Sequence, residues 1–144
     1  MNCFDCKLTS LDFSHCKALE TVNCFTNELT SIDVTQCKAL TSLACQNNRL
    51  TSLDVSNNTA LIDLMCYANR MTELDASTMS SPDDYSLGCG VQTSDGTTPQ
   101  TLTLTLRDEQ KPHWQYFMVP YEEMNANVEL AGGTANLFES CLLY

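Results

Sequence analysis

Residues 40–60 read LTSLACQNNRLTSLDVSNNTA, and this stretch contains one short pattern twice. Its first half follows LxxLxCxxN from Leu40 to Asn48, and its second half follows LxxLxVxxN from Leu50 to Asn58. The whole unit recurs every 21 residues, as in Cys3, Cys24, Cys45 and Cys66, in Leu8, Leu29, Leu50 and Met71, and in Asp12, Asp33, Asp54 and Asp75. A fixed period of this length indicates a solenoid, in which each repeat buries its apolar edge only against its neighbours.

Each repeat is expected to contain one short strand followed by a turn. The alternation around Leu43, Ala44 and Cys45 is typical of a strand with one side facing inward and the other facing outward. Asn48 comes next, and a side-chain amide at a turn can hydrogen-bond to neighbouring backbone. Asn27 and Asn69 occupy the same position, so we expect a stack of amides along the solenoid.

These residues resemble the leucine-rich-repeat family, whose LxxLxLxxNxL segment appears here with Cys at the third apolar position. The nearest form is the nested 21-residue type of bacterial surface proteins, with its phrase LTSLDVSNN at residues 50–58. The resemblance covers residues 1–76. It implies an α/β-type repeat solenoid that is mostly β, right-handed, with a parallel sheet on the concave side and a mixed C-terminal cap.

The sequence predicts one continuous domain, with leucine-rich repeats at 1–78 and a variant fifth repeat and cap at 79–144. Leu87, Cys89 and Gln92 restore the repeat order, with Gln in place of Asn. The remaining expectations for the cap are a polar loop at 93–99, a strand at 101–106 with its leucines inward, a short helix at 108–117 and a terminal hairpin at 127–138.

Nine cysteines would usually suggest disulfides, but their spacing favours free thiols. In-register parallel strands place equivalent Cβ atoms roughly 4.8 Å apart with parallel vectors, whereas a disulfide needs ~3.8 Å and converging vectors. Cys3, Cys24, Cys45 and Cys66 are therefore predicted to form a buried, reduced ladder. The spacing Cys3-x-x-Cys6 also fits half a zinc site or a redox pair, but the repeat explains both positions without either.

The composition argues against several classes of function. The chain has 7 basic and 18 acidic residues, a net charge of −11, which disfavours nucleic acid as a partner. No apolar run approaches the ~18 residues of a membrane span, and no signal peptide is visible. His15 and His113 are the only histidines and lie in no catalytic motif. We therefore expect no enzyme activity, no catalytic residue, no cofactor and no metal site.

The aspartates Asp12, Asp33, Asp54 and Asp75 form an outward-facing ladder with two interpretations. Like charges roughly 4.8 Å apart repel each other, and a bound cation such as Ca²⁺ would relieve this repulsion. Alternatively, each Asp accepts hydrogen bonds from backbone N–H groups or from nearby hydroxyls, with Thr30, Ser31, Thr51 and Ser52 as candidates. The second interpretation is favoured, because one carboxylate per repeat makes a sparse cage.

The concave face is the best candidate for binding. Outward positions beside the cysteine ladder hold Phe4, Asn23, Phe25, Gln46, Asp63, Met65 and Tyr67. Aromatic rings flanked by polar groups can stack on a ligand and hydrogen-bond to it, although Phe4 and Phe25 can also simply pack on each other. We expect a non-catalytic protein-binding module. The alternatives are a glycan-binding module on the same face and a structural spacer.

Three further expectations concern the setting of the chain. The resemblance implies a bacterial surface or secreted protein, hence an extracellular location. The chain begins inside a repeat, which suggests that it is part of a longer parent or a trimmed form. The edge at residues 1–16 leaves strand N–H and C=O groups unpaired, which predicts a weak homodimer through this N-terminal edge.

Overall fold

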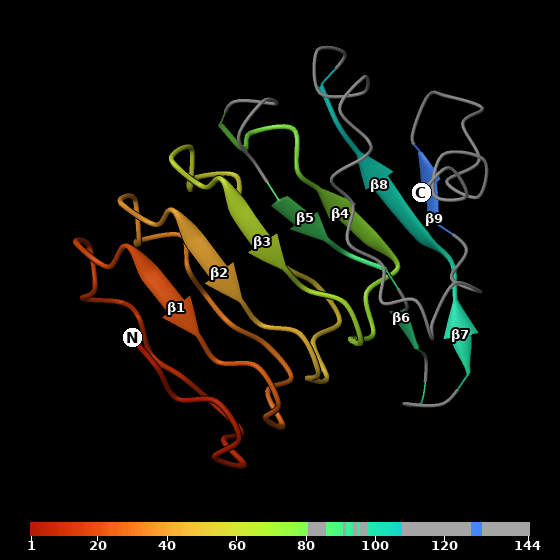
Figure 1. Ribbon diagram of the computed structural model, residues 1–144, viewed down its shortest axis with the longest axis horizontal. Coiled ribbons are helices and arrows are strands. Elements are labelled where there is room, and N and C mark those ends of the chain that lie inside the picture. Colours follow the sequence, from red (N-terminus) through yellow and green to blue (C-terminus); the bar gives the residue numbers. More distant parts are fainter. Residues whose placement is uncertain (81–85, 91, 94, 96–97, 108–127, 131–144) are drawn as a thin grey trace.

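The computed structural model describes residues 1–80, 86–90, 92–93, 95, 98–107 and, as a strand, 128–130. Its main sheet is parallel and contains β1 (Thr21–Asn23), β2 (Ser42–Ala44), β3 (Asp63–Met65) and β5 (Ser86–Gly88), in that order across the sheet (Figure 1). Val22 pairs with Leu43, which pairs with Leu64, so the sequence period is the strand register. The first repeat joins through a bridge between Asn2 and Asn23. The predicted mostly-β repeat solenoid is confirmed.

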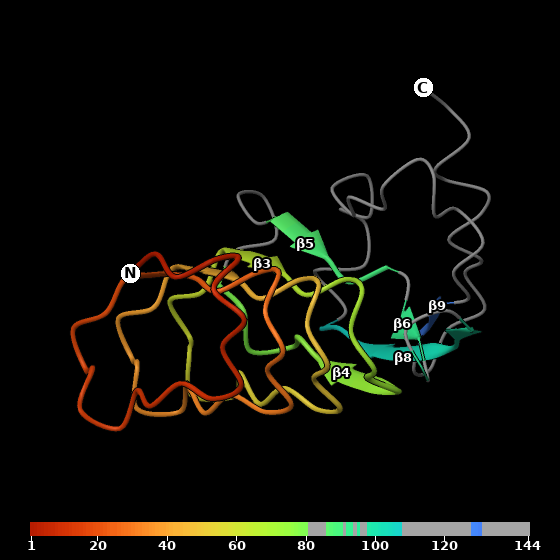
Figure 2. The ribbon, with the colours of Figure 1, turned by 90° about the horizontal axis from the view of Figure 1, so that it is seen from below.

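A second parallel sheet lies on the opposite side of the core (Figure 2). It contains β4 (Glu73–Asp75), β8 (Leu102–Thr105) and β9 (Val128–Leu130). β8 confirms the strand predicted at 101–106, and its leucines are buried as expected: Leu102, Leu104 and Leu106. β9 runs parallel to β8 and lies in the first arm of the hairpin predicted at 127–138. The remainder of that hairpin and the predicted helix at 108–117 lie outside the described residues.

The segment predicted as a polar loop at 93–99 is instead bounded by a small antiparallel ladder. It pairs β6 (Gln92–Thr93) with β7 (Pro99–Gln100). Gln92 is fixed because it belongs to the amide stack, and Asp95 accepts hydrogen bonds from Thr98 that help to fold the chain back. The two ends of the predicted loop, Thr93 and Pro99, therefore belong to paired strands.

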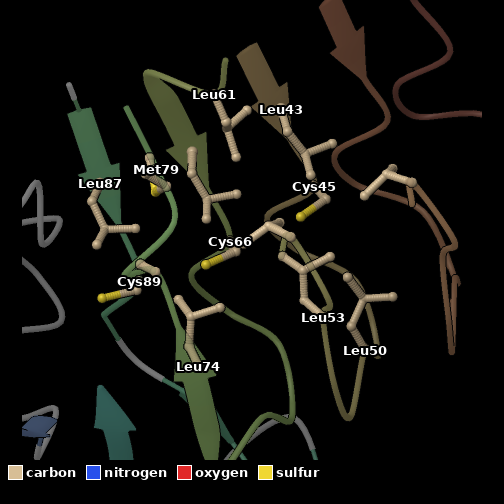
Figure 3. Packing of buried hydrophobic residues seen from close by; sticks show 14 of the residues in the cluster. Leu43, Cys45, Leu50, Leu53, Leu61, Cys66, Leu74, Met79, Leu87 and Cys89 are labelled. Atoms are coloured by element: carbon tan, nitrogen blue, oxygen red, sulfur yellow. The ribbon is translucent and has the colours of Figure 1, made fainter. Parts of the chain in front are cut away.

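The core lies between the two sides of each coil and contains the cysteine ladder (Figure 3). Cys24, Cys45, Cys66 and Cys89 are buried free thiols, which confirms the predicted reduced ladder and extends it into the fifth repeat. Burial raises the pKa of Cys24 and Cys89 to about 12, and raises the pKa of Cys45 and Cys66 well above the ordinary range. Cys3 differs because it is only half-buried.

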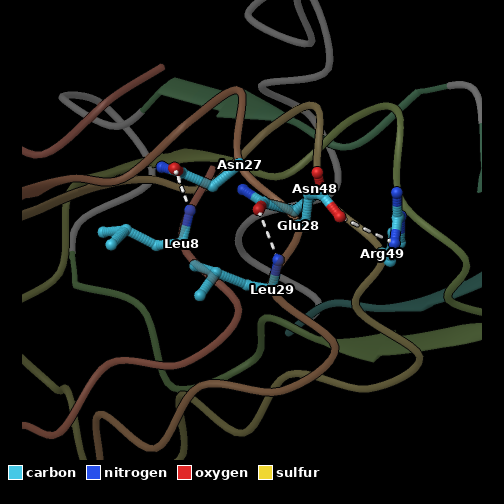
Figure 4. Close-up of polar contacts among 6 residues, drawn as sticks. All are labelled: Leu8, Asn27, Glu28, Leu29, Asn48 and Arg49. Carbon is cyan, nitrogen blue, oxygen red and sulfur yellow. Dashed lines mark hydrogen bonds and ion pairs between the residues drawn. The ribbon is translucent and has the colours of Figure 1, made fainter. Parts of the chain in front are cut away.

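The predicted stack of amides is present on one side of the coils. Asn48 Nδ2 donates to the carbonyls of Cys24 and Cys45, both at 3.0 Å, while its Oδ1 accepts from Leu29 N at 3.0 Å. Figure 4 shows this amide beside that of Asn27. Gln92 continues the stack, because its Oε1 accepts from Met71 N at 3.0 Å. The stack therefore satisfies backbone groups that would otherwise be buried without partners.

A second column of equivalent positions was not anticipated from the sequence. It holds Cys16, Cys37, Asn58 and Met79, on the turns opposite the main sheet. Asn58 is fully buried, and its Nδ2 donates to Val34 O at 2.9 Å and to Cys37 O at 2.8 Å. The 21-residue spacing from Cys16 onward was the signal that could have revealed it.

Candidate binding face

The outward face of the main sheet, called here the sheet face, corresponds to the concave face expected from the sequence. Because side chains alternate along a strand, the residues on either side of buried Val22, Leu43 and Leu64 point outward. The strand register then aligns these outward residues in rows across the repeats. The rows are Thr21, Ser42 and Asp63, then Asn23, Ala44 and Met65, then Phe4, Phe25, Gln46 and Tyr67. All seven predicted binding residues therefore lie on one face.

The last of these rows, called here the aromatic row, begins with two stacked rings. The rings of Phe4 and Phe25 lie parallel, with centroids 4.8 Å apart and planes 2° apart. The two residues thus do pack on each other, as the alternative interpretation required. Phe4 nevertheless remains 49% exposed, and Phe25 and Tyr67 are partly exposed. The stack therefore leaves apolar surface available for contact.

The turn that follows the aromatic row holds its backbone in the left-handed region. The residues next to the row have positive φ values: Asp5 (52°), Thr26 (55°), Asn47 (55°) and Ala68 (51°). Their N–H groups join adjacent coils, since Thr26 N donates to Gln46 O at 3.0 Å and Asn47 N donates to Tyr67 O at 3.1 Å. This conformation is unfavourable for Thr and Ala, so inter-coil bonding holds the turn in place.

Polar groups on the sheet face are only partly paired. Ser42 Oγ donates to Asp63 Oδ2 at 2.9 Å, and Asn23 Nδ2 donates to Asn2 Oδ1 at 2.6 Å. Asp63 Oδ1 and Gln46 Oε1 are shielded from solvent and have no hydrogen-bond partner within the described part of the chain. An acceptor in this state costs about 1–3 kcal/mol.

A row of charged residues, called here the charged row, follows the amide stack: Lys7, Glu28, Arg49 and Arg70. Arg49 Nη1 lies 3.1 Å from Glu28 Oε2, and both side chains are partly exposed (Figure 4). Arg70 is half-buried, and its guanidinium has no acceptor among the residues that the structure describes. Sequence reasoning missed this row, although the 21-residue spacing of its members was a signal that could have revealed it.

The aspartate ladder is explained by local hydrogen bonds. The Oδ1 atoms accept from backbone N–H groups two residues further on: Ser14 for Asp12 at 2.8 Å, Thr35 for Asp33, Ser56 for Asp54 and Ser77 for Asp75, each at 2.9 Å. The predicted donors were wrong, because the turn brings N–H groups that follow each Asp to its carboxylate, not the hydroxyl groups that precede it. These predicted donors were Thr30, Ser31, Thr51 and Ser52. Hydrogen bonds from Ser14, Thr35 and Ser56 lower the pKa of Asp12, Asp33 and Asp54.

The other candidate chemistry remains dispersed. Cys6 is exposed, and its Sγ donates to Phe4 O at 3.1 Å, while Cys3 is half-buried. Over the described ranges, no group of three or more His, Cys, Asp or Glu side chains could hold a metal ion. His15 is exposed, and His113 lies outside those ranges. The same ranges contain no helix long and apolar enough to cross a membrane.

Comparison with known proteins identifies the type of repeat. No family model and no curated protein matches this sequence. Among solved structures, the chain is similar to the functional domain of InlJ from Listeria monocytogenes, which includes a cysteine ladder. The identity is 25% and the TM-score 0.59, over 96% of this chain and 31% of that chain. The chain spans about a third of that chain, and its fold is a leucine-rich-repeat solenoid of the bacterial type that contains a cysteine ladder.

Proposed function

We propose that this leucine-rich-repeat solenoid is a non-catalytic protein-binding module of a bacterial surface or secreted protein, and that it binds through the sheet face. Part of the support is the likeness to InlJ, a repeat protein of which this chain spans about a third. The extracellular setting is part of the same proposal.

The observation that carries the proposal is the aromatic row on a rigid face. Phe4 and Phe25 are stacked and partly exposed, and Met65 and Tyr67 are partly exposed on neighbouring positions. Buried leucines and backbone bonds between coils fix the strands beneath them, so little ordering is required on binding. Rigid aromatic side chains with exposed surface are the typical anchors of protein interfaces.

A glycan is the second candidate. The exposed faces near Phe25 and Tyr67, with Ser42 and Asp63 across the sheet, offer stacking together with hydrogen-bonding groups. A glycan would cover a small part of the face. A protein partner would cover on the order of 800 Å² on each side, which spans several coils.

The test is to probe an array of extracellular protein domains and a glycan array with the purified chain. The double variant Phe25→Ala/Tyr67→Ala should lose binding to any protein hit and keep a nearly unchanged melting temperature, because both side chains point away from the core. Thr30→Ala/Thr51→Ala, at exposed positions away from the sheet face, is the matched control and should bind like the wild type. A protein hit that binds the Phe25 and Tyr67 double variant with wild-type affinity would contradict the proposal.

A further inference from the structure

The fourth repeat has a negative residue and a positive residue at positions where the second and third repeats do not have opposite charges. Asp63 and Met65 point outward from β3, Tyr67 belongs to the aromatic row, and Arg70 belongs to the charged row. These four residues are called here the fourth-repeat stripe. Asp63 and Tyr67 are separated by about 13 Å of extended chain. Arg70 comes after the left-handed turn at Ala68 and the buried Asn69. The stripe therefore has a carboxylate at one end, apolar surface beside it, and a guanidinium beyond the turn.

The equivalent positions of the neighbouring repeats do not combine opposite charges. The second repeat has Thr21 at one end and Glu28 at the other, and the third repeat has Ser42 and Arg49. Arg49 is already paired with Glu28. The fourth repeat alone among these has a charge at each end, and neither is neutralised by an ion pair with a described residue.

Both ends of the stripe carry a charge that no described ion pair neutralises. Arg70 is half-buried and has no acceptor within the described residues, in a chain with 18 acidic side chains. Its planar fork of N–H donors matches a carboxylate. At the other end, Asp63 Oδ2 accepts from Ser42 and Oδ1 is shielded from solvent, so the carboxylate attracts a cation through its charge. A ligand that places an anion at Arg70 and a cation near Asp63 would neutralise both ends.

We propose, as a refinement that rests on the proposed function, that the partner crosses the fourth-repeat stripe as an extended peptide segment of defined polarity. This segment places a Lys or Arg at Asp63, an apolar or aromatic side chain over Met65 and Tyr67, and an Asp or Glu at Arg70. Charge complementarity favours a peptide over an acidic sugar, because a sugar acid supplies the anion but no cation for Asp63. The chain's net charge of −11 makes Arg70 a local exception, whose field is limited to about 8 Å at physiological salt.

The test begins with selection from a random 12-residue peptide library on the wild-type chain. Selected peptides should carry basic and acidic residues flanking an aromatic or aliphatic one. The affinity of a synthetic selected peptide, measured by fluorescence anisotropy, should fall about five- to ten-fold with Arg70→Gln. Arg49→Gln is the matched control and should change the affinity less than about two-fold, since Arg49 is paired. The reversal Asp63→Arg/Arg70→Asp should reject the selected peptide and bind its charge-swapped version.

Different outcomes separate this refinement from the proposed function. Peptides that require Phe25 and Tyr67 but bind Arg70→Gln and the reversed variant like the wild type would overturn the refinement alone. Peptides indifferent to Phe25 and Tyr67 would contradict both, and no enrichment at all would overturn the refinement alone. Binding of sialylated or sulfated glycans that depends on Arg70, without binding of peptides, would show that Arg70 binds a sugar acid. This result would overturn the proposal of a peptide partner. Unchanged melting temperatures of the variants would confirm that the changes act on binding.

Discussion

The first repeat, residues 1–18, and the third repeat, residues 40–60, have equivalent residues in different environments. Cys45 and Leu50 are fully buried, and Leu53 is 8% exposed. Their first-repeat equivalents are only partly buried: Cys3, Leu8 and Leu11. The residue types are nearly the same, so the difference comes from the number of neighbouring coils. In a solenoid, burial is produced by the two adjacent repeats, and stability is a sum of such neighbour terms.

The amide stack shows the same difference in a second kind of interaction. Asn48 is bonded to backbone groups of its own coil and of the preceding coil. Its first-repeat equivalent is Cys6, an exposed thiol outside the amide stack. The following predictions alter inner coils and the first coil in matched ways, from the largest expected effect to the smallest.

Asn48→Ala should be the most destabilising change. It removes the acceptor of Leu29 N and the donor to the carbonyls of Cys24 and Cys45, all buried. Leaving such groups unpaired should lower the free energy of unfolding by on the order of 3 kcal/mol, measured by urea denaturation. Cys6→Ala at the exposed equivalent position should change it by less than about 0.5 kcal/mol. Equal losses for both variants would contradict the neighbour interpretation.

Sequence alone predicted those features in which position and residue type repeat together. The strand register, the cysteine ladder and the amide stack all follow from identical or similar residues 21 apart. The position of each expected binding residue on one face follows from the same register. Their role in binding stays a prediction.

Features without a repeated residue type could not be predicted in this way. Arg70 shares its row with Lys7, Glu28 and Arg49, and the spacing alone does not show that Arg49 rather than Arg70 pairs with Glu28. β9 pairs Val128 with Leu102, a spacing that breaks the 21-residue period. The donors to the aspartate ladder depend on the direction in which a turn folds, which the spacing of hydroxyl residues does not fix. Local geometry and irregular coils thus account for what sequence reasoning missed.

Alkaline pH should destabilise the inner coils through their thiols. The pKa of Cys24 and Cys89 is raised from the ordinary 9.0 to about 12, so the folded chain binds protons that the unfolded chain releases. The contribution of these thiols to the free energy of unfolding should be fully present below pH 9. It should fall as the pH rises toward 12, by up to roughly 1.4 kcal/mol per thiol for each pH unit. Thermal unfolding across this range measures the slope. Cys89→Ala should reduce the slope.

Ala68→Gly should stabilise the fold slightly. Ala68 has a φ of 51°, a region that glycine occupies without the steric cost that a Cβ brings. Relief of this cost, reduced by the greater freedom of glycine in the unfolded chain, should raise the free energy of unfolding by roughly 0.5 kcal/mol. Asn47→Gly is the matched control at the same position of the third repeat and should gain less, because Asn tolerates positive φ better. A loss of stability in Ala68→Gly would show that its methyl group contributes packing that exceeds the strain.

The weakest expected effect is association through the N-terminal edge. Residues 1–5 bond to the second repeat on one side, as in Cys3 N to Asn23 O at 2.8 Å, and no described residue pairs with their other side. Leu8 and exposed Met1 lie at this edge, so two copies would gain by covering it. Light scattering should show weak, concentration-dependent dimers that Leu8→Lys reduces. Thr9→Lys, at an exposed neighbouring position, adds the same charge and should leave association nearly unchanged. A wild-type chain that remains monomeric at every concentration would contradict association through this edge.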